Sequence, residues 1–184
     1  MNTTIIDLIR HGKSVDNVNK TVSGRSLTTL SEEGVAQAKA FTSDLNYDVI
    51  FVSSLTRAKQ TGEIIAEKYP NAVIQETDLI IEKYFGKIEG RKWEELEQEF
   101  PQFKDNIYEI GDHPELTEGE SIETIEQRVK EFIQIIENKY KGLNILVVTH
   151  GGLMRVLYKL LTNCSEEDLE NFHPKNIEIV RVEI

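Results

Sequence analysis

Three short runs of apolar, β-branched residues most constrain the fold of this chain. They cover residues 4–9, 49–52 and 144–149, and each has the length of a buried β-strand. Segments with helical spacing of apolar residues separate the runs, so strand and helix alternate along the chain. This alternation predicts an α/β fold, in the form of a three-layer α/β/α sandwich with a mostly parallel central sheet.

Four helices are predicted between and after these runs. The first follows Ser31, a helix-capping residue, and the second begins near residue 54 and ends before Pro70. The third spans residues 121 to about 140, and the fourth starts after His150, while residues 177–184 are typical of a final, partly exposed strand. The first and third helices are expected to bury Val35, Ala38, Phe41, Leu45, Ile122, Ile125, Val129, Phe132, Ile136 and Tyr140.

The segment at about 79–120 departs from this alternation. The length of 184 residues fits one domain over 1–184, and we interpret this segment as an insertion of short helices and loops that could cover a site. Its aromatic residues either shape the organic part of a substrate pocket or form ordinary core packing, and they include Tyr84, Phe85, Trp93 and Tyr108.

The composition excludes several classes of partner. With 21 Lys and Arg against 32 Asp and Glu, the chain has a net charge of −11 and lacks a basic run. Nucleic acids and anionic membranes bind clustered cations, so neither is expected as a partner. The single cysteine, Cys164, excludes an internal disulfide, and residues 1–10 lack the pattern of a signal peptide. We therefore expect a cytoplasmic protein.

Functional side chains follow each of the three predicted strands. Arg10-His11-Gly12 comes after the first, a segment from Ser53 to Arg57 after the second, and His150-Gly151-Gly152 after the third. Ligands of open parallel sheets bind at the carboxyl ends of the strands. The sequence therefore predicts a crevice that brings together two arginines and two histidines.

These residue types are suited to phosphoryl transfer. The guanidinium groups of Arg10 and Arg57 match phosphate oxygens bidentately and remain charged. A neutral imidazole is a competent nucleophile toward phosphorus, and fixed cations stabilise the charge of the transferring group. The glycines after each histidine permit close backbone approach. A phosphohistidine mechanism follows, although these residues alone do not supply a general acid for the leaving oxygen.

Two other interpretations of the histidines compete with this one. Taken singly, a histidine at a strand end is more often a hydrogen-bonded structural residue than a catalyst. A zinc site made by His11, His150 and a carboxylate is the second alternative. Arg10 and Arg57 would repel a divalent cation, however, so we expect neither a metal nor another cofactor.

The ordered motifs resemble those of the histidine phosphatase superfamily, also called phosphoglycerate mutase-like, over nearly the whole chain. The resemblance rests on Leu8-Ile9-Arg10-His11-Gly12 with Ser14 and Asn17, Ser23-Gly24, Leu30-Ser31 and Gly34, the segment Ser53 to Thr61, Glu82, Phe85-Gly86, Glu89-Gly90, Gly119-Glu120-Ser121 and Thr149-His150-Gly151-Gly152. It implies the phosphoglycerate mutase-like fold and metal-independent chemistry. Two positions depart from the family pattern: Lys13 replaces the common Glu or Gln, and Ile88 replaces a common Trp.

The resemblance also implies a role for each site residue. His11 would be the phosphorylated nucleophile, with Arg10, Arg57 and His150 lining the phosphate pocket. Glu82 would donate the proton to the leaving alcohol, and Glu89 is the alternative carboxyl. The further substrate and phosphate contacts implied are Asn17, Ser23, Gly24 and the backbone N–H of Gly151. His113 and His173 match no motif, so we expect structural or surface roles for them.

Three functions remain open at this point. The short chain is closer to the compact phosphatases of the family, which predicts a phosphomonoester hydrolase acting on a small phosphorylated metabolite. A cofactor-dependent phosphoglycerate mutase is the alternative enzyme, and a non-catalytic phosphate-ligand binding protein is the alternative of another class. The expected partner is a small-molecule phosphate ester, and the protein is expected to be a monomer or a homodimer.

Overall fold

One five-stranded sheet forms the centre of the molecule, which a computed structural model describes over residues 3–103 and 107–184. Its strand order is β3-β2-β4-β1-β5. β4 pairs in parallel with β1 and β2, β2 pairs in parallel with β3, and β5 alone is antiparallel to its neighbour β1. The strands are β1 (Ile5–Arg10), β2 (Val49–Ser53), β3 (Val73–Thr77), β4 (Asn144–Thr149) and β5 (Val180–Glu183). The predicted, mostly parallel sheet is confirmed.

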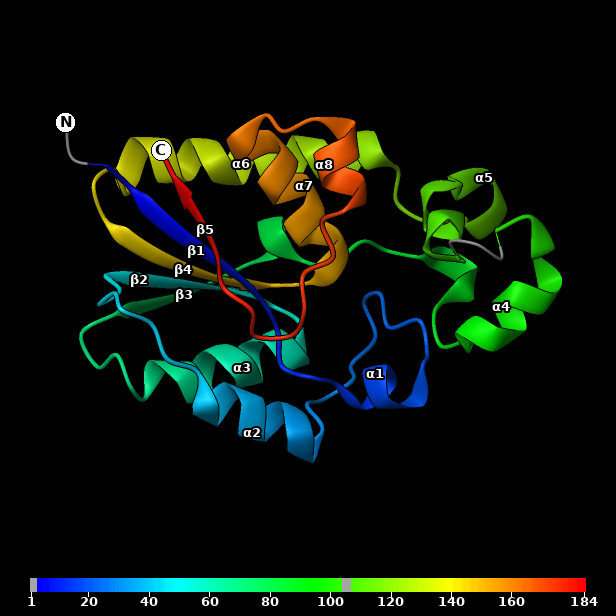
Figure 1. The fold of residues 1–184 in the computed structure, drawn as a ribbon, viewed down its shortest axis with the longest axis horizontal. Helices are drawn as coiled ribbons and strands as arrows, with labels where there is room; N and C mark the ends of the chain where they lie inside the picture. The colour runs from blue at the N-terminus through cyan, green and yellow to red at the C-terminus, as the bar shows by residue number, and fades with distance from the viewer. Residues whose placement is uncertain (1–2, 104–106) are drawn as a thin grey trace.

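Helices cover both faces of the sheet, as Figure 1 shows. One face carries α2 (Glu32–Ala40) and α3 (Thr56–Ala66), and the other carries α6 (Ile122–Lys139), α7 (Gly151–Thr162) and α8 (Glu166–Glu170). Alternate residues of β1 enter the two cores: Ile6 and Leu8 pack with α6 and α7, whereas Ile9 packs on the opposite face. No helix within the described ranges is both long and apolar enough to cross a membrane.

Several elements differ from the prediction, each for a local reason. β3 is not predicted, because Val73 and Ile74 lie on an edge strand and are 56% and 46% exposed. α2 ends at Ala40, so Phe41 and Leu45 reach the core from the following loop. Ile122 is 43% exposed because it is the first residue of α6 rather than part of its buried stripe.

The final strand is also shorter than predicted. It begins at Val180 rather than residue 177. Ile177 has a φ of +64°, in the left-handed region that a β-branched residue rarely adopts, so the backbone cannot be extended there.

Short helices fill the segment between β3 and α6, beyond the carboxyl ends of the parallel strands (Figure 1). Phe85, Trp93, Phe100 and Phe103 pack around their own small buried cluster, so Phe85 and Trp93 serve core packing. Tyr84 is 42% exposed, and the side chain of Tyr108 lies outside the described residues. The short helices are η1 (Asp78–Ile80), η2 (Gly86–Ile88), α4 (Trp93–Glu99), η3 (Pro101–Phe103), η4 (Ile107–Asp112) and α5 (Pro114–Thr117), and the remaining helix, α1 (Val15–Asn19), follows β1.

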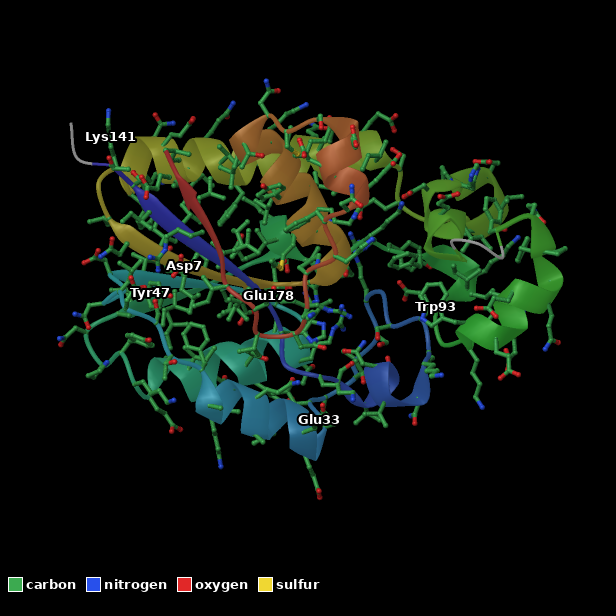
Figure 2. All side chains as sticks on the ribbon, viewed as in Figure 1. Asp7, Glu33, Tyr47, Trp93, Lys141 and Glu178 are labelled. Atoms are coloured by element: carbon green, nitrogen blue, oxygen red, sulfur yellow. The ribbon has the colours of Figure 1, made fainter. Side chains whose placement is uncertain are left out.

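A buried carboxylate lies at the centre of β1. Asp7 is fully buried and accepts hydrogen bonds from the Tyr47 hydroxyl at 2.6 Å and from Arg181 Nε at 2.8 Å. Figure 2 shows Asp7 and Tyr47 side by side between β1 and the helices below it. The pair joins β1 to the loop before β2 and, through Arg181, to β5.

Candidate active site

Three strand ends converge at the carboxyl edge of the sheet. His11 directly follows β1, Ser53 ends β2, and His150 directly follows β4. The ring centroids of His11 and His150 lie 5.2 Å apart, and His150 Nε2 lies 2.7 Å from Ser53 Oγ. Arg57, in the first turn of α3, reaches the same point. The structure therefore brings together residues that the sequence separates by more than a hundred positions.

The hydrogen bonds of His11 fix its tautomer. Its Nδ1 lies 2.7 Å from the carbonyl oxygen of Gly12, and the Arg57 Nε–H donates to its Nε2 at 3.1 Å. A carbonyl oxygen only accepts, so the ring proton is on Nδ1 and the lone pair is on Nε2. His11 thus presents a neutral nitrogen nucleophile toward a guanidinium group.

Arg57 is a buried cation that bridges the nucleophile and a neighbouring loop. Arg57 is 1% exposed. Its Nη2 donates to the carbonyl oxygen of Gly24 at 2.7 Å, and its Nη1 donates to that of Ser26 at 3.3 Å. Thr61 Oγ1 donates to the Arg57 carbonyl and accepts from the Gly12 N–H, which ties α3 to the segment after β1. A fixed, desolvated charge of this kind stabilises a transferring phosphoryl group.

Burial lowers the pKa of both histidines well below the ordinary value of 6.5. For His11 the positive charges of Arg57 and Arg10 lower it further, against the hydrogen bond to Gly12. For His150 the next causes after burial are Arg57 and His11. Both imidazoles are therefore neutral at neutral pH.

Two polar atoms at this edge of the sheet, or in the loop that Arg57 contacts, are buried without a hydrogen-bond partner that the structure describes. They are Ser23 Oγ and His150 Nδ1. A buried polar atom without a partner costs free energy, so such atoms are candidates for ligand contacts. When the Ser53 hydroxyl donates to His150 Nε2, the ring proton lies on Nδ1 and is available to an anion.

Glu82 lies at the start of the segment between η1 and η2 and is 8% exposed. Its Oε2 accepts from the N–H of Gly152 at 3.3 Å, and its Oε1 accepts from the N–H of Lys83 at 2.9 Å. Gly152 belongs to the first turn of α7, directly after His150 and Gly151. The carboxyl therefore lies beside the helix start that carries the second histidine.

Glu89, the alternative carboxyl, has a different environment. Its Oε1 accepts from the backbone N–H groups of Arg25 and Phe85, both at 3.0 Å. Gly24 has a φ of +48°, and a Cβ there would collide with the Glu89 carboxylate. Glu89 thus binds the backbone of two loops, whereas Glu82 contacts the start of α7 beside His150.

Among the other predicted phosphate contacts, Arg10 ends β1 and Gly151 begins α7, and Asn17 lies in α1, which follows β1. A Cβ built on Gly151 would lie 3.5 Å from the guanidinium of Arg10, so that cation is beside the start of α7. Asn17 forms a capping box with Ser14, in which its Oδ1 accepts from the Ser14 N–H at 3.2 Å. The Asn17 Nδ2 is then the group that can donate to an anion.

Lys13, His113 and His173 point to other surroundings. Lys13 Nζ pairs with Glu33 Oε2 at 2.8 Å, which directs it toward α2 rather than His11. His113 Nδ1 lies 2.8 Å from a carboxylate oxygen of Glu115, and His173 is exposed.

Sequence reasoning did not assign roles to several residues around the site. Asn176 Nδ2 donates to the His11 carbonyl at 2.6 Å, yet an isolated Asn far along the chain carries no motif. Glu120 and Arg128 form an ion pair at 3.1 Å. Glu120 belongs to the Gly-Glu-Ser motif, and Arg128 follows it by eight residues. This spacing does not indicate what the pair does.

The donor set is unsuited to a divalent cation. The Nε2 lone pair of His11, the atom that would ligate zinc, already accepts from the Arg57 guanidinium. Among the side chains that the structure describes, no three His, Cys, Asp or Glu are grouped as metal ligands would be.

Comparisons with known proteins point to the same chemistry. The model of the histidine phosphatase superfamily (branch 1) matches residues 6–184. The metal-independent phosphoserine phosphatase of Arabidopsis thaliana is 31% identical over 168 residues, which cover 88% of this chain and 70% of that protein. The solved alpha-ribazole phosphatase of Shigella flexneri is 27% identical with a TM-score of 0.78, and the match covers 96% of this chain and 89% of that one. A phosphoglycerate mutase from Bacillus anthracis, 22% identical, shares the fold, with a TM-score of 0.80 over 100% of this chain and 88% of that one.

Proposed function

Because this chain belongs to branch 1 of the histidine phosphatase superfamily, we propose that it is a metal-independent phosphomonoester hydrolase that acts through a phosphorylated His11. Its substrates are small phosphorylated metabolites. The observation that carries the proposal is the environment of His11: a buried, neutral imidazole whose Nε2 lone pair faces the guanidinium of Arg57. That arrangement suits attack on an anionic phosphorus centre better than metal ligation.

In the first step, His11 Nε2 attacks phosphorus. The N–P bond forms as the bond between phosphorus and the alcohol oxygen breaks. Glu82 gives its proton to that leaving oxygen and becomes a carboxylate. Arg10 and Arg57 stabilise the charge on the remaining phosphoryl oxygens, and the predicted contacts from Asn17, Ser23, Gly24, His150 and the Gly151 N–H complete the cradle.

In the second step, water hydrolyses the phosphohistidine. The Glu82 carboxylate accepts a proton from the water as its oxygen attacks phosphorus, and the N–P bond breaks. Inorganic phosphate leaves with the water oxygen, and both His11 and Glu82 return to their starting protonation states. Release of phosphate rather than its return to a bound alcohol separates this reaction from that of a mutase.

The test is phosphate release from p-nitrophenyl phosphate in the presence of EDTA. The wild-type protein is compared with His11→Ala and with His173→Ala, a matched loss of an exposed histidine. We expect activity that survives chelation, disappears in His11→Ala and persists in His173→Ala. Alkaline quenching followed by peptide mass spectrometry should locate the phosphoryl group on His11.

Three outcomes would overturn the proposal. Loss of activity to EDTA would mean that a metal takes part. Rapid isomerisation of 3-phosphoglycerate with catalytic 2,3-bisphosphoglycerate, without phosphate release, would favour a mutase. No turnover of a broad ester panel, together with saturable vanadate binding, would favour a binding protein.

We also propose a cytoplasmic location and a small phosphate ester as the partner, in a monomer or homodimer. The single cysteine supports the first. The ester panel should include phosphoserine and α-ribazole phosphate, because similar proteins carry those names.

A further inference from the structure

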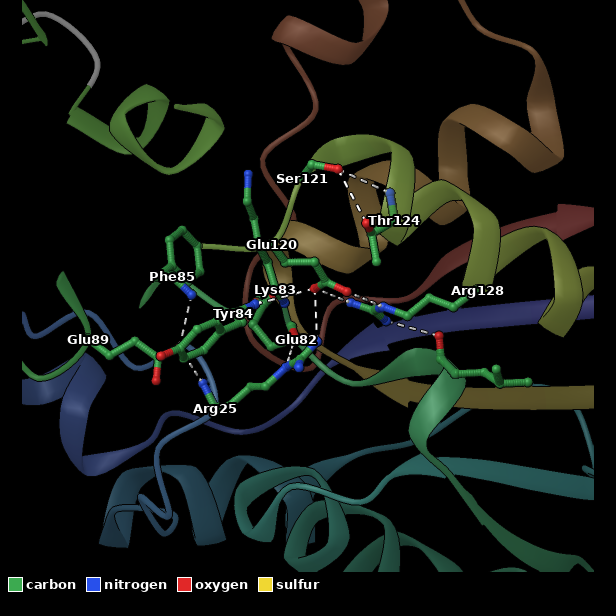
Figure 3. A network of polar contacts seen from close by, with 11 residues as sticks. Arg25, Glu82, Lys83, Tyr84, Phe85, Glu89, Glu120, Ser121, Thr124 and Arg128 are labelled. Carbon is green, nitrogen blue, oxygen red and sulfur yellow. Dashed lines mark hydrogen bonds and ion pairs between the residues drawn. The ribbon is translucent and has the colours of Figure 1, made fainter. Parts of the chain in front are cut away.

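A partly buried ion cluster lies next to the segment that carries Glu82. Glu120 accepts hydrogen bonds from Arg128 Nε and Nη2 at 3.1 and 3.2 Å and from Arg25 Nη2 at 2.9 Å. Its side chain is 9% exposed. Burial opposes ionisation, but the hydrogen bonds and charge of Arg128 and the charge of Arg25 lower the pKa of Glu120, which stays a carboxylate at neutral pH. Figure 3 shows the Glu120 carboxylate between Arg128 and Arg25, and Arg25 also reaching the backbone of Glu82.

The two arginines hold the backbone of this segment at Leu79 and at the candidate acid itself. Arg128 Nη1 donates to the carbonyl oxygen of Leu79 at 3.0 Å, and Arg25 Nε donates to that of Glu82 at 3.1 Å. The same guanidinium groups hold Glu120 through their other nitrogens. The position of the Glu82 backbone is therefore coupled to the carboxylate of Glu120 through two cations.

Glu120 also binds the segment directly, just beyond Glu82. Its N–H donates to the carbonyl oxygen of Tyr84 at 2.8 Å, and its Oε2 accepts from the Tyr84 N–H at 3.4 Å. The backbone of residues 79, 82 and 84 is thus held by one cluster. Arg25 lies in the loop after α1, Glu120 lies just before α6, and Arg128 lies within α6.

The Glu82 carboxyl depends on this support because its own contacts are with backbone. The hydrogen bonds described for its two oxygens come from the N–H groups of Lys83 and Gly152. Lys83 moves with the segment, whereas Gly152 is fixed in α7. A shift of the segment would therefore change the distance between the carboxyl and the reacting oxygen, and proton transfer depends steeply on that distance.

We propose that Glu120 is a positioning residue that sets the place of the proton donor Glu82 through Arg25 and Arg128. This inference rests on the proposed function, in which Glu82 protonates the leaving alcohol. Glu120 itself does not reach the reacting atoms. Its effect should therefore be felt by esters whose leaving group requires a proton and not by esters whose leaving group does not.

The experiment compares two esters in the wild-type protein and in Glu120→Gln, Arg25→Gln and Glu82→Gln. An alkyl phosphate releases a strongly basic alkoxide unless it is protonated, whereas p-nitrophenyl phosphate releases a stable phenolate. We measure kcat/KM, which reports the first step whatever the rate of phosphohistidine hydrolysis. We expect Glu82→Gln and Glu120→Gln to lower the value for the alkyl ester by about 10- to 100-fold, and that for the aryl ester by much less.

Matched controls separate positioning from a general loss of structure. Glu126→Gln removes a carboxylate of α6 that pairs with Lys130 at 3.1 Å on the surface, and it should change the activity on neither ester. Arg25 is 35% exposed, so Arg25→Gln carries the same test if Glu120→Gln does not fold. Arg25→Lys keeps the charge and should restore part of the lost alkyl-ester activity.

Equal losses on both esters, or no loss on either, would overturn the role of Glu120. Failure of the proposed function looks different: wild-type protein without phosphohistidine, or His11→Ala with full activity, would remove the premise instead.

Discussion

The Arg57 Nε–H donates directly to His11 Nε2, so in the resting site a guanidinium covers the lone pair of the proposed nucleophile. A bound phosphate therefore has to meet a cation and a nucleophile that already contact each other. The hydrogen bond also occupies the nitrogen that would otherwise be protonated. Burial keeps His11 neutral, and the charge of Arg57 lowers the pKa of His11 further while the same contact directs the cation toward the incoming anion.

The first prediction concerns Arg57→Lys. We expect kcat/KM for phosphate esters to fall by about 100-fold or more, because an ammonium group cannot reproduce the planar donation to His11, Gly24 and Ser26 together. Steady-state kinetics on p-nitrophenyl phosphate measures the change. A variant within a factor of a few of wild type would show that charge alone suffices.

The second prediction concerns stability at mildly acidic pH. His11 and His150 have lower pKa values folded than unfolded, so below pH 6.5 the unfolded chain binds more protons than the folded one. Stability from these groups is thus complete above that pH and falls as pH decreases toward the folded values. Urea unfolding between pH 7 and about 5 should show this loss, and His150→Gln should reduce its slope. An unchanged slope in the variant would contradict the assignment.

The third prediction concerns Gly152→Ala. A Cβ there would lie 2.8 Å from Glu82 Oε1, so the carboxyl must move. We expect lower alkyl-ester activity in Gly152→Ala, but little further loss when the same change is made in Glu82→Ala, where the colliding atoms are gone. A double-mutant cycle with additive effects would sink this explanation.

The fourth prediction concerns the buried carboxylate of β1. Tyr47→Phe removes the hydroxyl that donates to Asp7 at 2.6 Å, and should lower the free energy of unfolding by about 1–3 kcal/mol. Burial raises the pKa of Tyr47, so its hydroxyl remains a donor throughout the accessible range. Tyr47 packs with Phe41 and Tyr69 rather than in the site, so kcat should be unchanged. Chemical denaturation and a parallel assay measure the two effects.

The sequence predicts the parts of this protein that repeat a strong physical pattern. The strands at 5–10, 49–53 and 144–149 each contain a run of apolar residues, and α6 buries every third or fourth residue, so these elements can be predicted from the chain alone. β3 cannot be predicted in this way, because it is an exposed edge strand in which two apolar residues are followed by three polar ones.

The candidate site follows the same division. Arg10, His11 and His150 are predicted because they lie where parallel strands end, a place fixed by topology. Asn176 and Arg128 act through contacts 165 and 49 positions away along the chain, with His11 and Leu79 respectively. Such pairings depend on how loops dock in three dimensions, and no local spacing records them.

The position of β1 has a consequence for the order of folding. This first strand lies between β4 and β5, the last two in the chain, and the carbonyl of His11 accepts from Asn176. Contacts of such long sequence separation slow folding, because closing a long loop costs conformational entropy before the contacts stabilise the chain. During synthesis, β1 leaves the ribosome before its partners β4 and β5, which lie more than a hundred residues later in the chain. A nascent chain therefore cannot assemble the proposed nucleophile early, and catalytic competence is gained only in the last stage of folding.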